Sequence, residues 1–242
     1  MIDRAGEHIH AMLGTVSISV LKQEMYSESE AARLLRVAPS TLNYWLEGGE
    51  RRGKTYLPII REQAQGGRPP VTWAEFVECT WLREFRRVDR VPMAELRAFI
   101  NLLREQYGVP YPLAHFRPFA NQGQLVIMER AQTEAGLAPE FCAVAKVSGQ
   151  LVLTGPAEAF VQSLEWKNDA PVAWLPHDRE SPVRVRPDIR FGRPAIHGIS
   201  TEVLWEQIED GAEIAEIAED YGLTISDVHW AISYEAGVSA AA

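Results

Sequence analysis

Two neighbouring stretches of the chain carry the side chains with the clearest chemistry. The first stretch, residues 39–47, places four hydrogen-bonding side chains between apolar ones: Ser40, Thr41, Asn43 and Tyr44. The second stretch follows at once and is basic: Arg51, Arg52 and Lys54. Hydroxyl and amide groups can hydrogen-bond to base edges, and guanidinium and ammonium groups can pair with phosphates. We therefore take these seven residues as candidate DNA-binding residues.

The segment that must position them, residues 26–48, has the pattern of a helix-turn-helix. Ser27 and Glu30 have the spacing of a capping box, which predicts the start of a first helix. Pro39 suits the first turn of a second helix, where its missing N–H is not needed. The basic turn and the strand-like run after it predict a wing beside this second helix. Arg36 departs from the pattern, because glycine is more common at this point of the turn. The alternative interpretation of the segment is an ordinary helical hairpin in a core.

The charge of the chain is unevenly distributed. The whole chain of 242 residues has a formal net charge of −9. Residues 26–107 hold 13 Lys and Arg against 11 Asp and Glu, whereas residues 181–242 hold 4 against 11. Because the neutralisation of phosphates supplies much of the affinity for DNA, the charges assign DNA binding to the front of the chain.

Several classes of protein are not supported by the sequence. Cys79 and Cys142 provide neither a disulfide framework nor a zinc site, and they fit a reducing cytoplasm. No apolar run reaches the length of a membrane-spanning helix. We find no nucleophile–base pair, metal-ligand cluster or phosphate-binding glycine loop. We therefore expect a cytoplasmic protein that is not an enzyme, has no cofactor or metal and does not bind membranes.

The predicted fold class is α+β and mainly α, in four segments. Residues 1–24 are expected to be an N-terminal extension. Residues 25–108 form the winged helix-turn-helix, with a helix capped by Thr72 and Glu75 and a further helix over residues 93–107. Residues 109–180 form a small β-containing middle module. Its predicted elements are a helix at Ala157–Trp166 and strands at Leu125–Met128, Phe141–Val147, Gln150–Thr154 and Pro171–Leu175.

Residues 181–242 are predicted to form a second, three-helix unit with the spacing of a helix-turn-helix. The expected helices are Thr201–Asp210, Glu213–Tyr221 and a third that Thr224 and Asp227 cap. Residues 202–235 contain ten acidic side chains and no Lys or Arg. Such a surface repels DNA, so we expect a protein-interaction domain. Its candidate contact residues are Trp205, His229 and Trp230, although a tryptophan at helical spacing is more often part of a core.

The C-terminal run from Phe191 to Glu235 resembles a small bacterial domain found in VapB-like antitoxins of VapBC-type toxin–antitoxin modules. Three groups of residues carry the resemblance: Gly192, Pro194, Ile196 and Gly198; Gly211, Ile217, Ala218, Asp220 and Tyr221; Asp227, Val228, Ala231, Ile232 and Tyr234. The chain departs from the usual Gly-Thr-Arg at residues 198–200. The N-terminal half is similar to the DNA-binding domain of MerR-type regulators, although its last helix spans only about two heptads.

This resemblance implies a non-catalytic antitoxin. It would neutralise a PIN-domain ribonuclease toxin, bind double-stranded operator DNA and repress its own operon. Because one helix-turn-helix buries little DNA surface, we also expect a homodimer. The alternative is a MerR-like transcriptional regulator that has no toxin partner and senses a ligand with its middle module.

Four arginines lie in the proline-punctuated segment that leads into the C-terminal unit: Arg184, Arg186, Arg190 and Arg193. A guanidinium can pair with both oxygens of a carboxylate. If the partner is a PIN-domain toxin, one of these arginines is expected to reach its acidic site. The alternative, which the sequence favours, is that they balance the acidic helices of their own unit.

Overall fold

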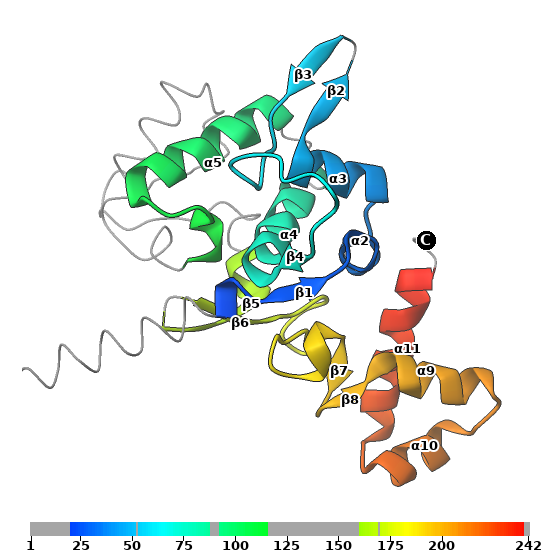
Figure 1. Cartoon of the computed structure of the whole chain (residues 1–242). Coiled ribbons are helices and arrows are strands. Elements are labelled where there is room, and N and C mark those ends of the chain that lie inside the picture. Colours follow the sequence, from blue (N-terminus) through cyan, green and yellow to red (C-terminus); the bar gives the residue numbers. More distant parts are fainter. Residues whose placement is uncertain (1–19, 52, 88–91, 116–159, 169, 240–242) are drawn as a thin grey trace, which may run out of the picture.

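The structure is a computed structural model that describes residues 20–51, 53–87, 92–115, 160–168 and 170–239 (Figure 1). The described residues form helices and short antiparallel strand pairs, with more residues in helices than in strands. The predicted α+β class is confirmed. The predicted strands Leu125–Met128, Phe141–Val147 and Gln150–Thr154 lie outside the described residues, as does Arg52.

The described chain begins with strand β1 (Glu24–Tyr26), which leads directly into helices α2 (Glu28–Leu35) and α3 (Pro39–Glu47). The capping box is confirmed, because the Ser27 N–H donates to Glu30 Oε2 at 2.9 Å and the Glu30 N–H donates to Ser27 Oγ at 3.3 Å. Arg36 ends α2 in the left-handed region with φ 53°. This left-handed residue turns the chain so that α3 can begin three residues later.

A β-hairpin of strands β2 (Gly49–Arg51) and β3 (Lys54–Tyr56) follows α3 and projects from the body of the protein (Figure 1). Gly48 makes the junction possible. Its φ is +75°, and a Cβ atom there would lie 2.2 Å from the carbonyl oxygen of Tyr56. After the hairpin, the N–H groups of Ile59 and Ile60 both donate to the carbonyl oxygen of Trp45, at 2.9 and 3.0 Å. The base of the hairpin is thereby attached to α3.

Helix α4 (Trp73–Arg87) is the centre of the first hydrophobic core, and β4 (Val71–Thr72) before it pairs with β1. Its predicted capping box is confirmed, since the Thr72 N–H donates to Glu75 Oε2 at 2.9 Å. Helix α5 (Met93–Tyr107) and the 3-10 turn η1 (Pro112–Ala114) pack around α4. Leu21 also packs into this core, ahead of the start predicted at residue 25.

Buried charged groups attach the loop after the hairpin to α4. Arg61, whose side chain is 2% exposed, donates to Glu75 at 2.8 Å and to Glu47. Glu78 is fully buried, where it accepts a 2.9 Å hydrogen bond from the Leu113 N–H and lies 4.0 Å from Arg104. Burial raises the pKa of the Glu78 carboxyl to about 8.

Strands β5 (Leu164–Lys167) and β6 (Ala170–Trp174) form a hairpin that packs on the first core. The strand predicted at residues 171–175 is confirmed. The helix predicted over residues 157–166 is wrong at its C-terminal end, because the helix ends at residue 162 and β5 begins at Leu164; residues 157–159 lie outside the described residues. Ser163 N–H and Oγ both bond the carbonyl oxygen of Phe160, which closes the turn. Pairing of buried Leu164 with Trp174 then outweighs the local helical periodicity.

An extended segment joins the two cores. Val185 exchanges two 2.9 Å backbone hydrogen bonds with Trp174, and Arg184 exchanges two of the same length with Ala195. The expected extended conformation is confirmed here. It is interrupted by the 3-10 turn η3 (Arg190–Gly192), where φ is 50° at Arg190, 53° at Phe191 and 76° at Gly192. A non-glycine residue in this left-handed region costs about 1–3 kcal/mol.

The second core belongs to the C-terminal unit. A short pair, β7 (Ala195–Ile196) and β8 (Ile199–Ser200), leads into helices α9 (Thr201–Glu209), α10 (Ile214–Tyr221) and α11 (Ile225–Ser239). The three predicted helices are confirmed, as is the cap of the third, where the Asp227 N–H donates to Thr224 Oγ1 at 3.1 Å. The core between them is apolar: Val183, Ile196, Leu204, Ile217, Val228 and Ala231.

The C-terminal unit contacts the side of the first unit that carries β1 and α2. Tyr26 Oη donates to the carbonyl oxygen of Gly192 at 2.6 Å. The guanidinium of Arg36 donates to the carbonyl oxygen of Tyr234 at 3.2 Å and lies 5.5 Å from the centre of its ring. Helix α11 therefore touches the turn between α2 and α3.

Candidate functional site

The outward face of α3 carries the four candidate residues predicted for base contacts. Ser40 is exposed, and Thr41, Asn43 and Tyr44 are half-buried. The opposite face of α3 is buried in the first core: Leu42, Trp45 and Leu46. The apolar spacing on α3 thus leaves one polar face directed away from the core, as an element that enters a groove requires.

The hairpin and α3 are joined by an aromatic and cationic cluster. The guanidinium carbon of Arg51 lies 4.2 Å from the centre of the Tyr44 ring, within the range of a cation–π interaction. The Tyr56 ring meets the same tyrosine edge-on, with the ring centroids 6.2 Å apart. Two of the predicted DNA-binding residues are therefore in direct contact, which fixes the hairpin relative to α3.

The remaining candidates differ in their surroundings. Lys54 is exposed and lies opposite Arg51 in the hairpin register. The amide nitrogen of Asn43 donates to Glu28 Oε2 at 3.1 Å, so this side chain already has one partner within the protein. Its amide oxygen is still an acceptor for a hydrogen bond from outside.

Two arginines of α5 hold the chain that returns from the hairpin. Arg97 donates to the carbonyl oxygens of Leu57 and Pro58, the second at 2.6 Å, and Arg104 donates to that of Ile60. Sequence analysis did not single out either arginine. Their partners lie about 40 residues earlier in the chain, and no local pattern connects the two segments.

The four arginines of the joining segment have partners within the chain. Arg184 donates to Glu165 at 2.8 Å, and Arg186 makes two 3.0 Å bonds to Asp188, which hold the pKa of that carboxyl below its usual value. Arg190 donates to the carbonyl oxygen of Gly198 at 2.8 Å, and Arg193 to Glu202 at 3.3 Å. Among these bonds, that of Arg193 reaches the acidic helices. Arg190 and Arg193 are also exposed.

The predicted contact residues of the C-terminal unit are not equivalent. His229 is exposed and Trp205 is half-buried. The ring of Trp230 faces the first unit, because it meets the ring of His177 edge-on with centroids 5.8 Å apart. Trp230 therefore already has a role in joining the two units.

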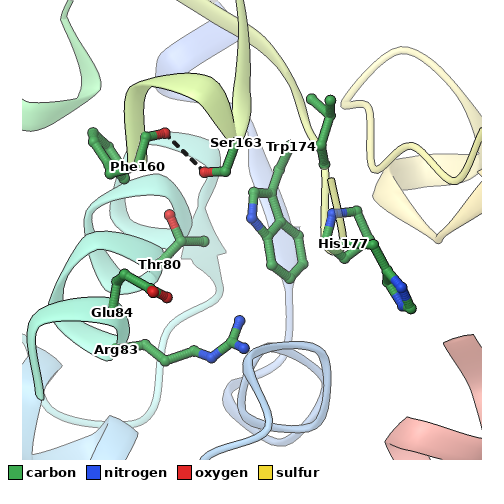
Figure 2. Close-up of a pocket in the computed structure, with 9 residues that line it drawn as sticks. Thr80, Arg83, Glu84, Phe160, Ser163, Trp174 and His177 are labelled. Atoms are coloured by element: carbon green, nitrogen blue, oxygen red, sulfur yellow. Dashed lines mark hydrogen bonds between the residues drawn. The ribbon is translucent and has the colours of Figure 1, made fainter. Parts of the chain in front are cut away.

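A small pocket lies next to this junction (Figure 2). Its volume is about 120 Å³. Helix α4 contributes Thr80 and Arg83 to the wall, and β6 with the loop after it contributes Trp174 and His177. Burial, together with the nearby Arg36, lowers the pKa of His177, which favours the neutral form of its ring.

The sequence and the fold of this protein both resemble those of known proteins. Residues 183–234 match a family model described as a protein of unknown function (DUF433). Over 222 residues, which is 89% of this chain and 92% of the relative, the chain is 32% identical to "Uncharacterized protein Rv2308" of Mycobacterium tuberculosis. The chain belongs to the Rv2308 family.

The Rv2308 family chain is also similar to a second protein of the same organism, named "Putative antitoxin VapB45". The two are 27% identical over 216 residues, which cover 83% of this chain and 89% of the relative. Its fold resembles the X-ray crystal structure of Rv2018 from Mycobacterium tuberculosis, with a TM-score of 0.69 and 23% identity. That likeness covers 87% of this chain and 98% of the other, so the two proteins share a fold over most of their length.

The described residues contain neither a membrane-spanning helix nor a cluster of metal-ligating side chains. None of the helices described for this Rv2308 family protein is long and apolar enough to cross a membrane. Within the same residues, no three His, Cys, Asp or Glu side chains gather in a way that could hold a metal ion.

Proposed function

We propose that this protein is an antitoxin that neutralises a PIN-domain ribonuclease and represses its own operon by binding DNA. The observation that carries the proposal is its similarity to a protein named as a VapB antitoxin, which extends over 83% of this chain. The similarity includes both the front of the chain and the C-terminal unit. In this proposal the protein acts only by binding, in the cytoplasm, and has no catalytic activity.

The DNA-binding surface in this proposal is a winged helix-turn-helix. Helix α3 would lie in the major groove with Ser40, Thr41, Asn43 and Tyr44 toward the bases. Arg51, Arg52 and Lys54 of the hairpin would pair with neighbouring phosphates. Three features support this assignment: the polar outward face of α3, the projecting hairpin, and the contact between Arg51 and Tyr44.

The toxin-binding surface would belong to the C-terminal unit. Its helices carry ten acidic and no basic side chains between residues 202 and 235, which disfavours contact with DNA. These helices pack around one shared apolar core, as in a helix-turn-helix, but the outer surface of the unit suits a protein partner. Arg190 and Arg193, at the edge of this unit, are the exposed members of the predicted arginine set.

The test is to produce the protein together with a PIN-domain ribonuclease, if its genomic neighbour encodes one. We expect the two chains to copurify and the ribonuclease to lose activity at an equimolar ratio. A gel shift with the promoter DNA of the same operon measures the DNA-binding half of the proposal separately. Free ribonuclease activity in the presence of excess protein would contradict the antitoxin assignment.

A regulator without a toxin partner is the second candidate, and the pocket in Figure 2 favours it. At about 120 Å³ the pocket is smaller than the 300–1,000 Å³ usual for sites that bind larger ligands. It would hold only a small polar molecule between Arg83 and His177. The absence of a PIN-domain gene beside this one, together with DNA binding that a small molecule changes, would favour this alternative.

A further inference from the structure

The turn η3 presents an aromatic side chain to solvent. Phe191 is 86% exposed, which is the highest value among the large apolar residues of the described chain. Its backbone and those of Arg190 and Gly192 are all left-handed. Glycine adopts that conformation freely, but phenylalanine and arginine rarely do. A phenyl ring in this position gains little from burial within its own chain.

The turn is held in place by the rest of the fold. Tyr26, which is buried in the first core, donates its hydroxyl hydrogen to the carbonyl oxygen of Gly192 at 2.6 Å. A Cβ atom on Gly192 would lie 2.3 Å from that hydroxyl, so the backbone passes directly against the tyrosine. Arg190 donates to the carbonyl oxygen of Gly198 at 2.8 Å. The exposed ring is therefore carried on a fixed turn between the two units.

Strain at a fixed turn, next to an exposed aromatic group, is typical of a binding element. An aromatic ring that is already oriented loses little freedom when it enters a pocket, so more of its burial contributes to affinity. Arginines stand on both sides of the ring in sequence, at positions 190 and 193, and both are exposed. A complementary surface would offer an apolar pocket with carboxylates at its rim.

We propose that Phe191 is the anchor by which this protein binds its ribonuclease partner, with Arg190 and Arg193 contacting acidic groups around the receiving pocket. The inference rests on the proposed antitoxin function and names the surface that performs it. It favours Arg190 and Arg193 over Arg184 and Arg186 because the first two side chains are exposed, whereas the other two are half-buried.

The other exposed apolar side chains of the described residues do not combine a left-handed backbone with neighbouring arginines. Leu57 lies just after the hairpin of the proposed DNA-binding surface, and Ile225 lies at the start of α11. Ile225 is 53% exposed and has no left-handed backbone and no neighbouring arginine in sequence. It therefore serves as a matched control for the loss of an exposed apolar side chain in the same unit.

The experiment measures the affinity of the purified full chain for the ribonuclease by calorimetry. Phe191→Ala and Phe191→Gly are each expected to weaken binding by at least about 30-fold, as for an interface hot spot. Phe191→Tyr keeps the ring and is expected to stay within about threefold of the wild type. Ile225→Ala is expected to bind like the wild type.

A second measurement separates binding from folding. Glycine is free to adopt the left-handed backbone, so Phe191→Gly is expected to raise the Tm of the free protein by about 2–4 °C while it weakens the complex. Operator binding in a gel shift should not change in any of these variants. A residue with only a structural role would instead lower the Tm when it is removed.

Any of the following results would overturn the inference. If the wild type binds and inhibits the ribonuclease but both truncations of Phe191 bind equally well, the antitoxin function stands and the anchor is wrong. Equal losses in the Ile225→Ala variant would mean that Phe191 has no special role. Conversion of a dimer to a monomer with unchanged ribonuclease binding would assign the ring to a contact between copies. If the wild type does not bind the ribonuclease at all, both proposals fail.

Discussion

At the scale of single residues, Glu78 is a carboxyl group enclosed in the first core. Burial raises the pKa of this carboxyl from its usual 4.5 to about 8. The folded protein therefore keeps a proton that the unfolded chain releases, so the contribution of this group to stability is fully present below about pH 4.5 and is lost as the pH rises through 8. We expect Glu78→Gln to flatten this dependence and to be more stable than the wild type at pH 8.5, by on the order of a few kcal/mol.

Denaturant unfolding at several pH values checks this prediction. Glu50→Gln, at an exposed position of β2, is the control and should leave the pH dependence unchanged. A Glu78→Gln variant with the pH profile of the wild type would show that the buried carboxyl is ionised near neutral pH, with Arg104 as its effective partner.

Arg36 is the second residue whose role is decided by its neighbours. Its left-handed backbone would suit glycine, but its guanidinium contacts the backbone and the ring of Tyr234 in α11. We expect Arg36→Gly to leave the helix pair folded and to loosen the attachment of α11, which would appear as faster hydrogen exchange around Tyr234. Arg33→Gln is the control, since the exposed pair of Arg33 with Glu202 at 3.9 Å should contribute little. Unchanged exchange in α11 would contradict a joining role for Arg36.

At the scale of elements, the hairpin β2–β3 should supply affinity for phosphates without reading sequence. Arg51→Ala combined with Arg52→Ala is expected to weaken binding to all DNA sequences and to reduce the slope of log K against log salt by about one to two. Glu50→Gln, which removes a negative charge from the same strand, should not weaken binding. Gel shifts at several salt concentrations measure both variants. Unchanged operator affinity in the double variant would rule out the hairpin as a wing.

At the scale of the whole molecule, the proposed DNA-binding surface is small. One helix-turn-helix contacts one half-site, and specific binding usually requires two copies on a two-fold operator. We expect a homodimer whose half-sites lie one helical turn, or a multiple of it, apart. Helix α5 spans 15 residues, too short for a stable coiled coil alone, so other surfaces must contribute. Light scattering of the free protein and of its DNA complex checks this, and a monomer in both would contradict it.

The sequence by itself determined most of the helices. Capping boxes at Ser27, Thr72 and Thr224 are local signals, as is Gly108, whose left-handed backbone ends α5. The groups that satisfy a helix end lie within a few residues of it. The polar face of α3 was also predictable, since helical periodicity places Leu42, Trp45 and Leu46 together in the core. The counts of charged residues predicted different binding surfaces for the two units, and this prediction did not require knowledge of how the units pack.

Tertiary structure decided what depends on residues far apart in the chain. The pattern before residue 166 looked helical, but pairing of Leu164 with Trp174 made it a strand. Arg36 departs from the predicted helix-turn-helix pattern, and its contact with Tyr234, 198 positions away, is not visible in any local pattern. Phe191 carried no signal of its own, because exposure and left-handed backbone are set by Tyr26 and the strands on either side. Hydrophobic periodicity records only the local chain, whereas these contacts depend on where the whole fold brings distant segments together.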